Sequence, residues 1–285
     1  MRPNLFLVGA PKCGTSALHA YLAQHPDIFM SEPKEPHFFC TDVNAPFAIR
    51  EQAAYEALFA KARTPIAGES SATYLYSSVA AGNLHAYNPD ARIIMMLRNP
   101  LEMLPSLHSQ KRVNGTEEFE SFRDALEAET RRKAGDLRAQ GAFPYYYDAA
   151  MYSEQLERFL AAFPRGQLHI IIFDDFKRDA AGVYGQTLEF LGLPAFNANL
   201  KVVNSNKTIR SRALHDFLQN PRSPVNRLPK PFSTLGYKAL DKLNSAPQKR
   251  TPLEPDVADK LKRDFAPEVA RLSTLLGRDL SHWVA

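Results

Sequence analysis

The 285-residue chain is poor in cysteine and has no long apolar run, and each shortage excludes a class of protein. Two cysteines, Cys13 and Cys40, cannot form a disulfide framework, and no Cys/His cluster has the spacing of a metal site. No apolar run approaches the roughly 20 residues of a membrane-spanning helix. The net charge of +4 suits an anionic ligand, but no interleaved basic and aromatic array favours nucleic acid. We therefore expect two reduced thiols, no metal, no membrane span and no nucleic-acid partner.

The remaining composition is that of an ordinary globular enzyme. Apolar residues make up 45% of the chain and charged residues 23%, enough for a sizeable core. The amino terminus leads directly into the first apolar run and leaves no room for a signal peptide, so we expect a cytoplasmic protein. No internal repeat divides the chain, and we expect one domain over residues 1–285.

The amino-terminal segment has the pattern of a strand, a short loop and a helix. The apolar run Leu5–Val8 has the length of a strand, and the helical pattern that follows the loop begins at Thr15 or Ser16, either of which is suited to cap it. This order directs backbone N–H groups and the positive end of a helix dipole at an anion. Lys12 adds a cation, and Gly14 lets a ligand approach the backbone. The segment therefore predicts a cradle for a nucleotide 5′-phosphate.

The position of the lysine decides which phosphate loop this is. In the Walker A loop G-x-x-x-x-G-K-[ST] the lysine follows the second glycine, whereas here Lys12 precedes Gly14. The loop resembles the 5′-phosphosulfate-binding loop of sulfotransferases, which use 3′-phosphoadenosine-5′-phosphosulfate (PAPS). The resemblance implies that the loop binds PAPS through Lys12, Cys13, Gly14, Thr15 and Ser16. An ordinary strand–turn–helix entry to an α/β domain is the alternative for the loop taken alone.

A second charged segment, Glu32–Phe39, contains two prolines and is therefore predicted to be a loop. It presents the carboxylate of Glu35 beside the imidazole of His37, which suits a general base, although a solvated charged turn is the alternative. It resembles the Glu-x-His-Phe-Phe segment of heparan-sulfate-type sulfotransferases. That resemblance implies that Glu35 deprotonates the acceptor with help from His37. Cys40 stands where the 3-O-sulfotransferase branch has aspartate, so the acceptor contacts of that branch are not transferred here.

A third segment begins after the apolar run Ala91–Leu97, which is typical of a strand covered on both faces. Arg98 ends the run, and an Asn-Pro pair suited to start a helix follows it. The segment resembles the 3′-phosphate-binding sequence Arg-[Asp/Asn]-Pro-x-Glu-Arg-x-x-Ser. The resemblance implies that Arg98 and Ser106 bind the 3′-phosphate of PAPS. For Arg98 alone, a surface ion pair is the alternative.

Two further residues are candidates for the base that deprotonates the acceptor. Glu69 ends a short predicted strand, so it either faces the same pocket or serves as a structural hydrogen-bond acceptor. His108 lies on the helix predicted after Arg98 and is a second candidate.

Two regions are less regular. Residues 113–150 are predicted to be an acceptor-side insertion, whose run Tyr145–Tyr147 either packs internally or lines an acceptor-binding wall. Residues 204–252 are rich in proline and basic residues, and are predicted to form a loop over the nucleotide. By resemblance, Lys249 and Arg250 are the nearest counterparts of the residues that hold the 3′-phosphate, and a solvated basic loop is the alternative.

Together these patterns predict an α/β protein with a P-loop-like three-layer fold, a mainly parallel central sheet and helices on both faces. The resemblance implies a PAPS-dependent sulfotransferase that transfers a sulfuryl group to a hydroxyl or amine of a small-molecule or glycan acceptor, with PAP as the nucleotide product and no metal. A P-loop kinase or ATPase is one alternative, against which the position of Lys12 argues. A non-catalytic nucleotide-binding protein on the same scaffold is the other.

Overall fold

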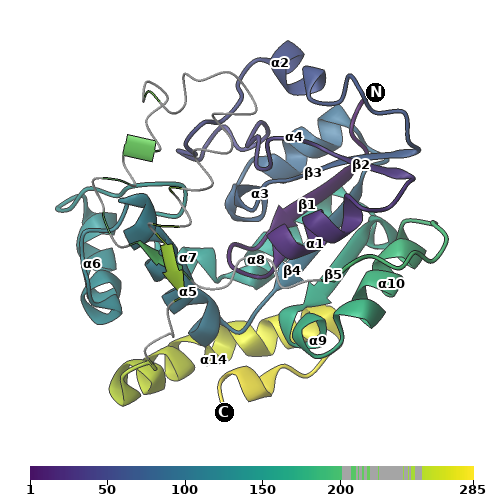
Figure 1. The fold of residues 1–285 in the computed structure, drawn as a ribbon. Helices are drawn as coiled ribbons and strands as arrows, with labels where there is room; N and C mark the ends of the chain where they lie inside the picture. The colour runs from purple at the N-terminus through teal and green to yellow at the C-terminus, as the bar shows by residue number, and fades with distance from the viewer. Residues whose placement is uncertain are drawn as a thin grey trace.

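A parallel sheet of five strands forms the centre of the molecule, in the spatial order β2-β3-β1-β4-β5 (Figure 1). The computed structural model describes residues 1–200 and 252–285, with a few residues between them that include the short antiparallel strands β6 and β7. The strands are β1 (Leu5–Gly9), β2 (Ile28–Met30), β3 (Ile66–Ser70), β4 (Arg92–Leu97), β5 (Leu168–Ile172), β6 (Lys207–Ile209) and β7 (Ser245–Pro247). Every residue of β1 and β3 is buried, as expected for strands covered on both faces.

Helices cover both faces of the sheet, which confirms the predicted α/β class. In the view of Figure 1, α1 lies in front of the sheet, while α4 and α8, which contact each other, lie behind it. The helices are α1 (Thr15–Leu22), α2 (Gln52–Ala57), α3 (Thr73–Tyr76), α4 (Ala80–Tyr87), α5 (Pro100–Asn114), α6 (Phe122–Ala134), α7 (Tyr146–Ala149), α8 (Tyr152–Ala162), α9 (Phe173–Arg178), α10 (Ala180–Phe190) and α14 (Pro255–Leu276).

The starts of α1 and α5 differ in how their first turns are capped. The side chain of Asn99 accepts a hydrogen bond from the Leu101 amide, and Pro100 is the first residue of α5, as the sequence predicts. The prediction that Thr15 or Ser16 caps α1 is wrong. The cap residue is Gly14 in the left-handed conformation, with φ of +94°, and in the described part of the chain no side chain caps this helix. The amino terminus of α1 is therefore presented by backbone groups alone.

The region 113–150 packs beside α5 and α14 rather than against the sheet. Its centre is a buried ion cluster in which Glu117 accepts hydrogen bonds from Arg132 at 2.6 Å and from the Tyr146 hydroxyl at 2.7 Å. The ring of Tyr147 stacks on Phe265 of α14. Of the two interpretations of the tyrosine run, these contacts support internal packing for Tyr146 and Tyr147.

Candidate functional site

The three segments singled out in the sequence meet at one edge of the sheet. β1 lies between β3 and β4, and all three strands run in the same direction. Their carboxyl ends therefore lie side by side: β1 leads into the Lys12 loop and β4 into Arg98, while the Glu35 loop, which follows β2, is hydrogen-bonded to Ser70 at the end of β3. In parallel α/β sheets this edge is where ligands bind.

The loop after β1 has a backbone conformation that favours glycine at position 14. Gly14 adopts a φ of +94°, and a Cβ atom there would lie 3.1 Å from the Phe173 ring and 3.2 Å from Met96. Only glycine fits this position without strain, because φ is in the left-handed region and an added Cβ would also force the Phe173 or Met96 side chain to shift. Lys12 precedes it with φ of +62°, and its ammonium donates to Oε1 of Gln110 on α5 at 3.1 Å.

The other loop residues do not all present their side chains. Cys13 is fully buried, with its Sγ 3.3 Å from the Pro11 carbonyl oxygen, and burial raises the pKa of its thiol to about 12. Cys13 can therefore contribute to nucleotide binding only through its backbone. Thr15 is buried and Ser16 is half-buried at the first turn of α1.

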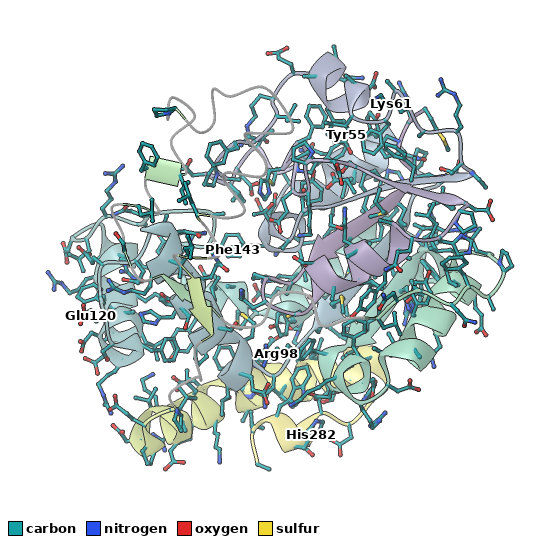
Figure 2. All side chains as sticks on the ribbon, in the orientation of Figure 1. Tyr55, Lys61, Arg98, Glu120, Phe143 and His282 are labelled. Atoms are coloured by element: carbon teal, nitrogen blue, oxygen red, sulfur yellow. The ribbon has the colours of Figure 1, made fainter. Side chains whose placement is uncertain are left out.

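Arg98 connects the end of β4 to the Lys12 loop (labelled in Figure 2). Its buried guanidinium donates to the Lys12 carbonyl at 3.2 Å, and lies over the Phe173 ring at 4.5 Å from the ring centroid. It also forms an ion pair with Glu102 at 2.5 Å. Ser106, the second predicted 3′-phosphate ligand, is buried on α5. Lys249 and Arg250 lie outside the described residues.

The Glu35 loop brings a carboxylate, an imidazole and an ammonium together. Glu35 Oε2 lies 3.5 Å from His37 Nε2, and Glu35 Oε1 lies 2.5 Å from the Lys34 ammonium. The other imidazole nitrogen of His37, Nδ1, is hydrogen-bonded to the Thr73 hydroxyl at 2.8 Å. Burial lowers the pKa of His37, so a neutral imidazole faces the Glu35 carboxylate.

Unusual backbone conformations coincide with the predicted catalytic residues. Among the described residues, positive φ outside glycine occurs at Lys12, Glu35, His37 and Phe47. Such conformations cost free energy and persist where the surrounding structure enforces them, which is common at functional sites. Three of these four positions, Lys12, Glu35 and His37, are residues that the sequence and its family resemblance predict to be catalytic.

The segment that follows β3 holds the Glu35 loop in place. The Glu35 amide donates to the Ser70 carbonyl at 3.0 Å, and the His37 amide donates to the Ser71 hydroxyl at 3.1 Å. The Phe38 amide donates to the Tyr74 hydroxyl at 3.0 Å. The loop thus lies on the carboxyl end of β3, beside the strand that carries Lys12.

Glu69 and His108 have structural surroundings. The side chain of Glu69 is fully buried beneath the Glu35 loop, and accepts hydrogen bonds from the hydroxyls of Tyr55, Ser71 and Tyr74. His108 is buried between α5 and α6, where its Nε2 pairs with the Phe119 carbonyl at 3.0 Å. For Glu69, these contacts support the interpretation as a structural acceptor.

The comparison with known proteins places this geometry in a family. The family model described as "Sulfotransferase domain" matches residues 2–215. The chain belongs to this family. A solved sulfotransferase from Alicyclobacillus acidocaldarius is 31% identical, aligns over the full length of both chains and superposes with a TM-score of 0.76. The predicted family and the prediction of an enzyme are thereby confirmed.

Curated relatives of this sulfotransferase domain act on heparan sulfate, according to their names. The human bifunctional heparan sulfate N-deacetylase/N-sulfotransferase 2 is 28% identical over 73% of this chain and 23% of its own length. The mouse heparan sulfate glucosamine 3-O-sulfotransferase 6 is 28% identical over 67% of this chain and 52% of its own length. The chain therefore spans between about a quarter and about half of these relatives.

Sequence reasoning missed two residues of the site. Nδ1 of His19, on α1, is hydrogen-bonded to the Ser70 hydroxyl at 2.8 Å, and burial lowers the pKa of His19 to about 4. Gln110 contacts the Lys12 ammonium. Helical spacing could have indicated both residues, because positions four apart lie on the same face of a helix. His19 lies four residues after Thr15, and Gln110 lies four residues after Ser106.

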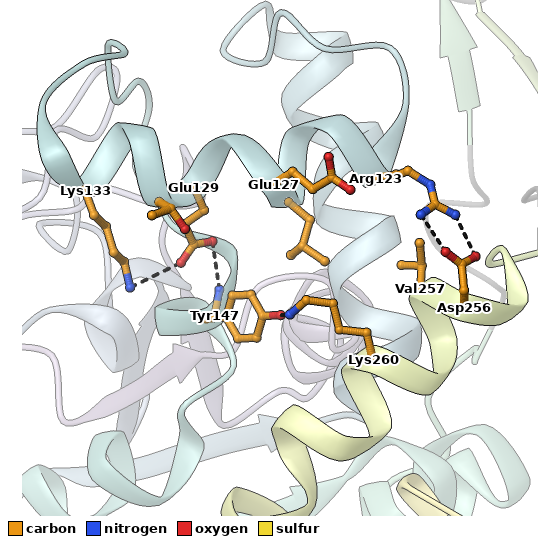
Figure 3. Close-up of a pocket in the computed structure, with 10 residues that line it drawn as sticks. Arg123, Glu127, Glu129, Lys133, Tyr147, Asp256, Val257 and Lys260 are labelled. Carbon is orange, nitrogen blue, oxygen red and sulfur yellow. Dashed lines mark hydrogen bonds and ion pairs between the residues drawn. The ribbon is translucent and has the colours of Figure 1, made fainter.

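A separate hollow of about 420 Å³ lies between α6 and α14 (Figure 3). Its cations are already paired: Arg123 with Asp256, and Lys133 with Glu129, while Lys260 donates to the Tyr147 hydroxyl at 2.7 Å.

Within the described ranges, no group of three or more His, Cys, Asp or Glu side chains is placed to hold a metal ion. No helix in the same ranges is both long enough and apolar enough to cross a membrane.

Proposed function

We propose that this sulfotransferase transfers a sulfuryl group from PAPS to a hydroxyl or amine of a carbohydrate or small-molecule acceptor. The observation that carries the proposal is the attachment of the Glu35 loop to the end of β3, the neighbour of the strand that leads to Lys12. A base for the acceptor and a cation for the donor thus lie at the same edge of one rigid sheet.

The donor end is assigned to the loop after β1 and the start of α5. The amides of Gly14 to Ser16 and the Lys12 ammonium hold the 5′-phosphosulfate, since the amino terminus of α1 carries no acidic residue in its first turn. Arg98 and Ser106 hold the 3′-phosphate. Arg98 is already oriented by the Lys12 carbonyl and by Glu102, so a phosphate would share or replace the Glu102 contact. PAPS supplies the sulfuryl group and departs as PAP.

The reaction is an in-line displacement in which Glu35 is the base. The acceptor oxygen or nitrogen forms a bond to sulfur, the bond from sulfur to the 5′-phosphate oxygen breaks, and the acceptor proton passes to Glu35. Lys12 stabilises the negative charge that develops on the departing phosphate. A neutral His37 has its Nε2 3.5 Å from Glu35 Oε2 and its Nδ1 hydrogen-bonded to the Thr73 hydroxyl, which holds the imidazole beside the carboxylate. The names of the curated relatives support a carbohydrate acceptor.

The alternative of a non-catalytic nucleotide-binding protein predicts PAP binding without a sulfated product. The kinase or ATPase alternative predicts Mg²⁺-dependent ATP turnover.

To test the proposal, radiolabelled PAPS is incubated with N-desulfated heparin oligosaccharides, chitin oligomers, 4-nitrophenol and tyramine, and labelled products are separated. We expect a labelled product with at least one of these, and stabilisation by PAP of about 2.7 kcal/mol at 100 times its dissociation constant. A larger thermal shift with ATP–Mg²⁺ than with PAP would contradict the proposal.

A further inference from the structure

Glu69 is a buried carboxylate surrounded by hydroxyl groups rather than by cations. Its side chain is fully buried, and none of the ion pairs found among residues 1–200 and 252–285 involves it. Oε1 accepts from Tyr74 at 2.6 Å and from Tyr55 at 3.2 Å, and Oε2 accepts from Ser71 at 2.8 Å. A buried carboxylate is normally stabilised by an arginine or lysine, so this arrangement requires a different explanation.

Two of the three donors connect Glu69 to the Glu35 loop. The Ser71 hydroxyl donates to Glu69 and accepts the His37 amide at 3.1 Å. The Tyr74 hydroxyl donates to Glu69 and accepts the Phe38 amide at 3.0 Å. A hydroxyl has a single hydrogen to donate. Because Ser71 and Tyr74 each donate theirs in a hydrogen bond to the Glu69 carboxylate, the lone pairs of each hydroxyl oxygen are available to accept from the loop amides. Each connection therefore depends on the carboxylate at its far end.

We propose that Glu69 is a positioning residue for the reaction, which fixes the direction of the Ser71 and Tyr74 hydroxyls and through them the backbone of the Glu35 loop. The inference rests on the proposed role of Glu35 as the base. Glu35 and His37 have φ of +66° and +53°, conformations that a loop does not keep without external contacts. The Ser70 carbonyl holds the start of this strained stretch, and the Glu69 network holds its end.

The third donor supplies a matched control. Tyr55 donates to the same oxygen of Glu69 as Tyr74 does, and is buried to the same extent (Tyr55 is labelled in Figure 2). Its ring stacks on Phe38 at 4.5 Å, but the contacts of its hydroxyl are with Glu69 and not with a loop amide. Tyr55→Phe and Tyr74→Phe thus each remove one hydroxyl from Glu69, and only Tyr74→Phe also releases the loop.

The test compares these two variants with the wild-type chain at about pH 8, using radiolabelled PAPS and the acceptor that gives the strongest product. We expect Tyr74→Phe to lower kcat by roughly 10- to 100-fold, because a small misplacement of a reacting group has effects of this size. The KM for PAPS and the affinity for PAP stay unchanged. Tyr55→Phe keeps kcat within about threefold of wild type. Glu69→Gln and Ser71→Ala are expected to lower kcat as Tyr74→Phe does.

A folded Tyr74→Phe variant with the kcat of wild type would overturn the inference, as would equal losses of kcat in both tyrosine variants. Hydrogen exchange of the peptide that covers the His37 and Phe38 amides gives an answer without any acceptor. The expected result is faster exchange in Tyr74→Phe and unchanged exchange in Tyr55→Phe. If no acceptor is sulfated by the wild-type chain, the proposed function fails, whereas unchanged exchange in Tyr74→Phe refutes the Glu69 network itself.

Discussion

The donor end and the base end of this site are built in different ways. At the donor end, the groups assigned to phosphate are consecutive backbone amides, and one glycine in a left-handed conformation sets their direction. At the base end, the Glu35 loop depends on hydroxyl groups that lie more than thirty residues further along the chain. A phosphate is large and symmetric enough to be held by a helix terminus, whereas a base must be aimed at one proton.

The largest effect that distinguishes the two ends is expected from Glu35→Gln. The amide cannot accept the acceptor proton, so we predict a loss of kcat of about 10²- to 10⁴-fold. Binding of PAP is expected to stay unchanged, because the donor end is built from other residues. Product formation and calorimetric titration with PAP measure the two quantities.

Glu32→Gln is the matched control for this prediction, since Glu32 is an exposed carboxylate of the same loop. It should retain full activity. Full activity of Glu35→Gln would instead transfer the base role to His37 and contradict the assignment of the base end.

Gly14→Ala is expected to disturb the donor end of the site rather than the base end. The added Cβ would lie 3.1 Å from the Phe173 ring, in a backbone conformation with φ of +94°. Strain and overpacking together predict a loss of roughly 2–5 kcal/mol in the free energy of unfolding, and at least about tenfold weaker PAP binding. Urea unfolding and titration with PAP measure both.

Gly82→Ala provides the control, because Gly82 lies inside α4 and a Cβ there meets no atom within 4 Å. It should be neutral or stabilising by up to about 1 kcal/mol. If Gly14→Ala bound PAP as tightly as wild type, the amides of this loop would not be the phosphate ligands.

The sequence was sufficient for most of the fold. The strands at Leu5–Gly9 and Arg92–Leu97 were predictable because a strand covered on both faces must be a continuous apolar run. The start of α5 was predictable because capping by Asn99 is a local interaction. The start of α1 was predicted wrongly. There, Gly14 replaces a side-chain cap, and local propensity favours Thr15 or Ser16.

The support of the base could not be predicted from the sequence. Glu35 and His37 were visible as neighbours in one short loop, but the residues that orient them come from α3 and from the end of β3. Whether Tyr74 directs its hydroxyl at Glu69 depends on the packing of those elements, which no spacing rule encodes. Glu69 was ambiguous in the sequence for the same reason, since a strand-end carboxylate is compatible with a pocket and with a buried network.

The protonation of Glu69 predicts a pH dependence of stability at the base end. Burial raises the pKa of Glu69 from its ordinary value of 4.5 to about 7, although three hydroxyl donors oppose the increase. Between these values the folded protein keeps a proton that the unfolded chain has released. The contribution of Glu69 to the free energy of unfolding therefore falls as pH rises through this window, by roughly 3 kcal/mol in total, and levels off above it.

Glu69→Gln should remove this slope, because the amide does not titrate. The hydroxyls of Tyr55 and Tyr74 face Glu69, but burial raises the pKa of each far above the window, so both stay protonated. Glu35 is the other charged group that acts on Glu69, and it is present in both proteins. Urea unfolding at pH 5 and pH 8 should show the variant gaining stability relative to wild type at the higher pH. A difference between the two proteins that is independent of pH would contradict the buried charge.

The smallest effect is expected at a place that belongs to neither end. Arg123 joins α6 to the start of α14 through ion pairs with Glu254 and Asp256, and all three side chains are in contact with solvent. Figure 3 shows the pair of Arg123 with Asp256. Exposed pairs of this kind contribute little and are screened by salt. Arg123→Gln should therefore lower Tm slightly in dilute buffer, lose that difference in about 1 M NaCl, and leave kcat and PAP affinity unchanged. A loss of activity in this variant would mean that the α6–α14 contact positions one of the two ends, and the site would then extend beyond the edge of the sheet.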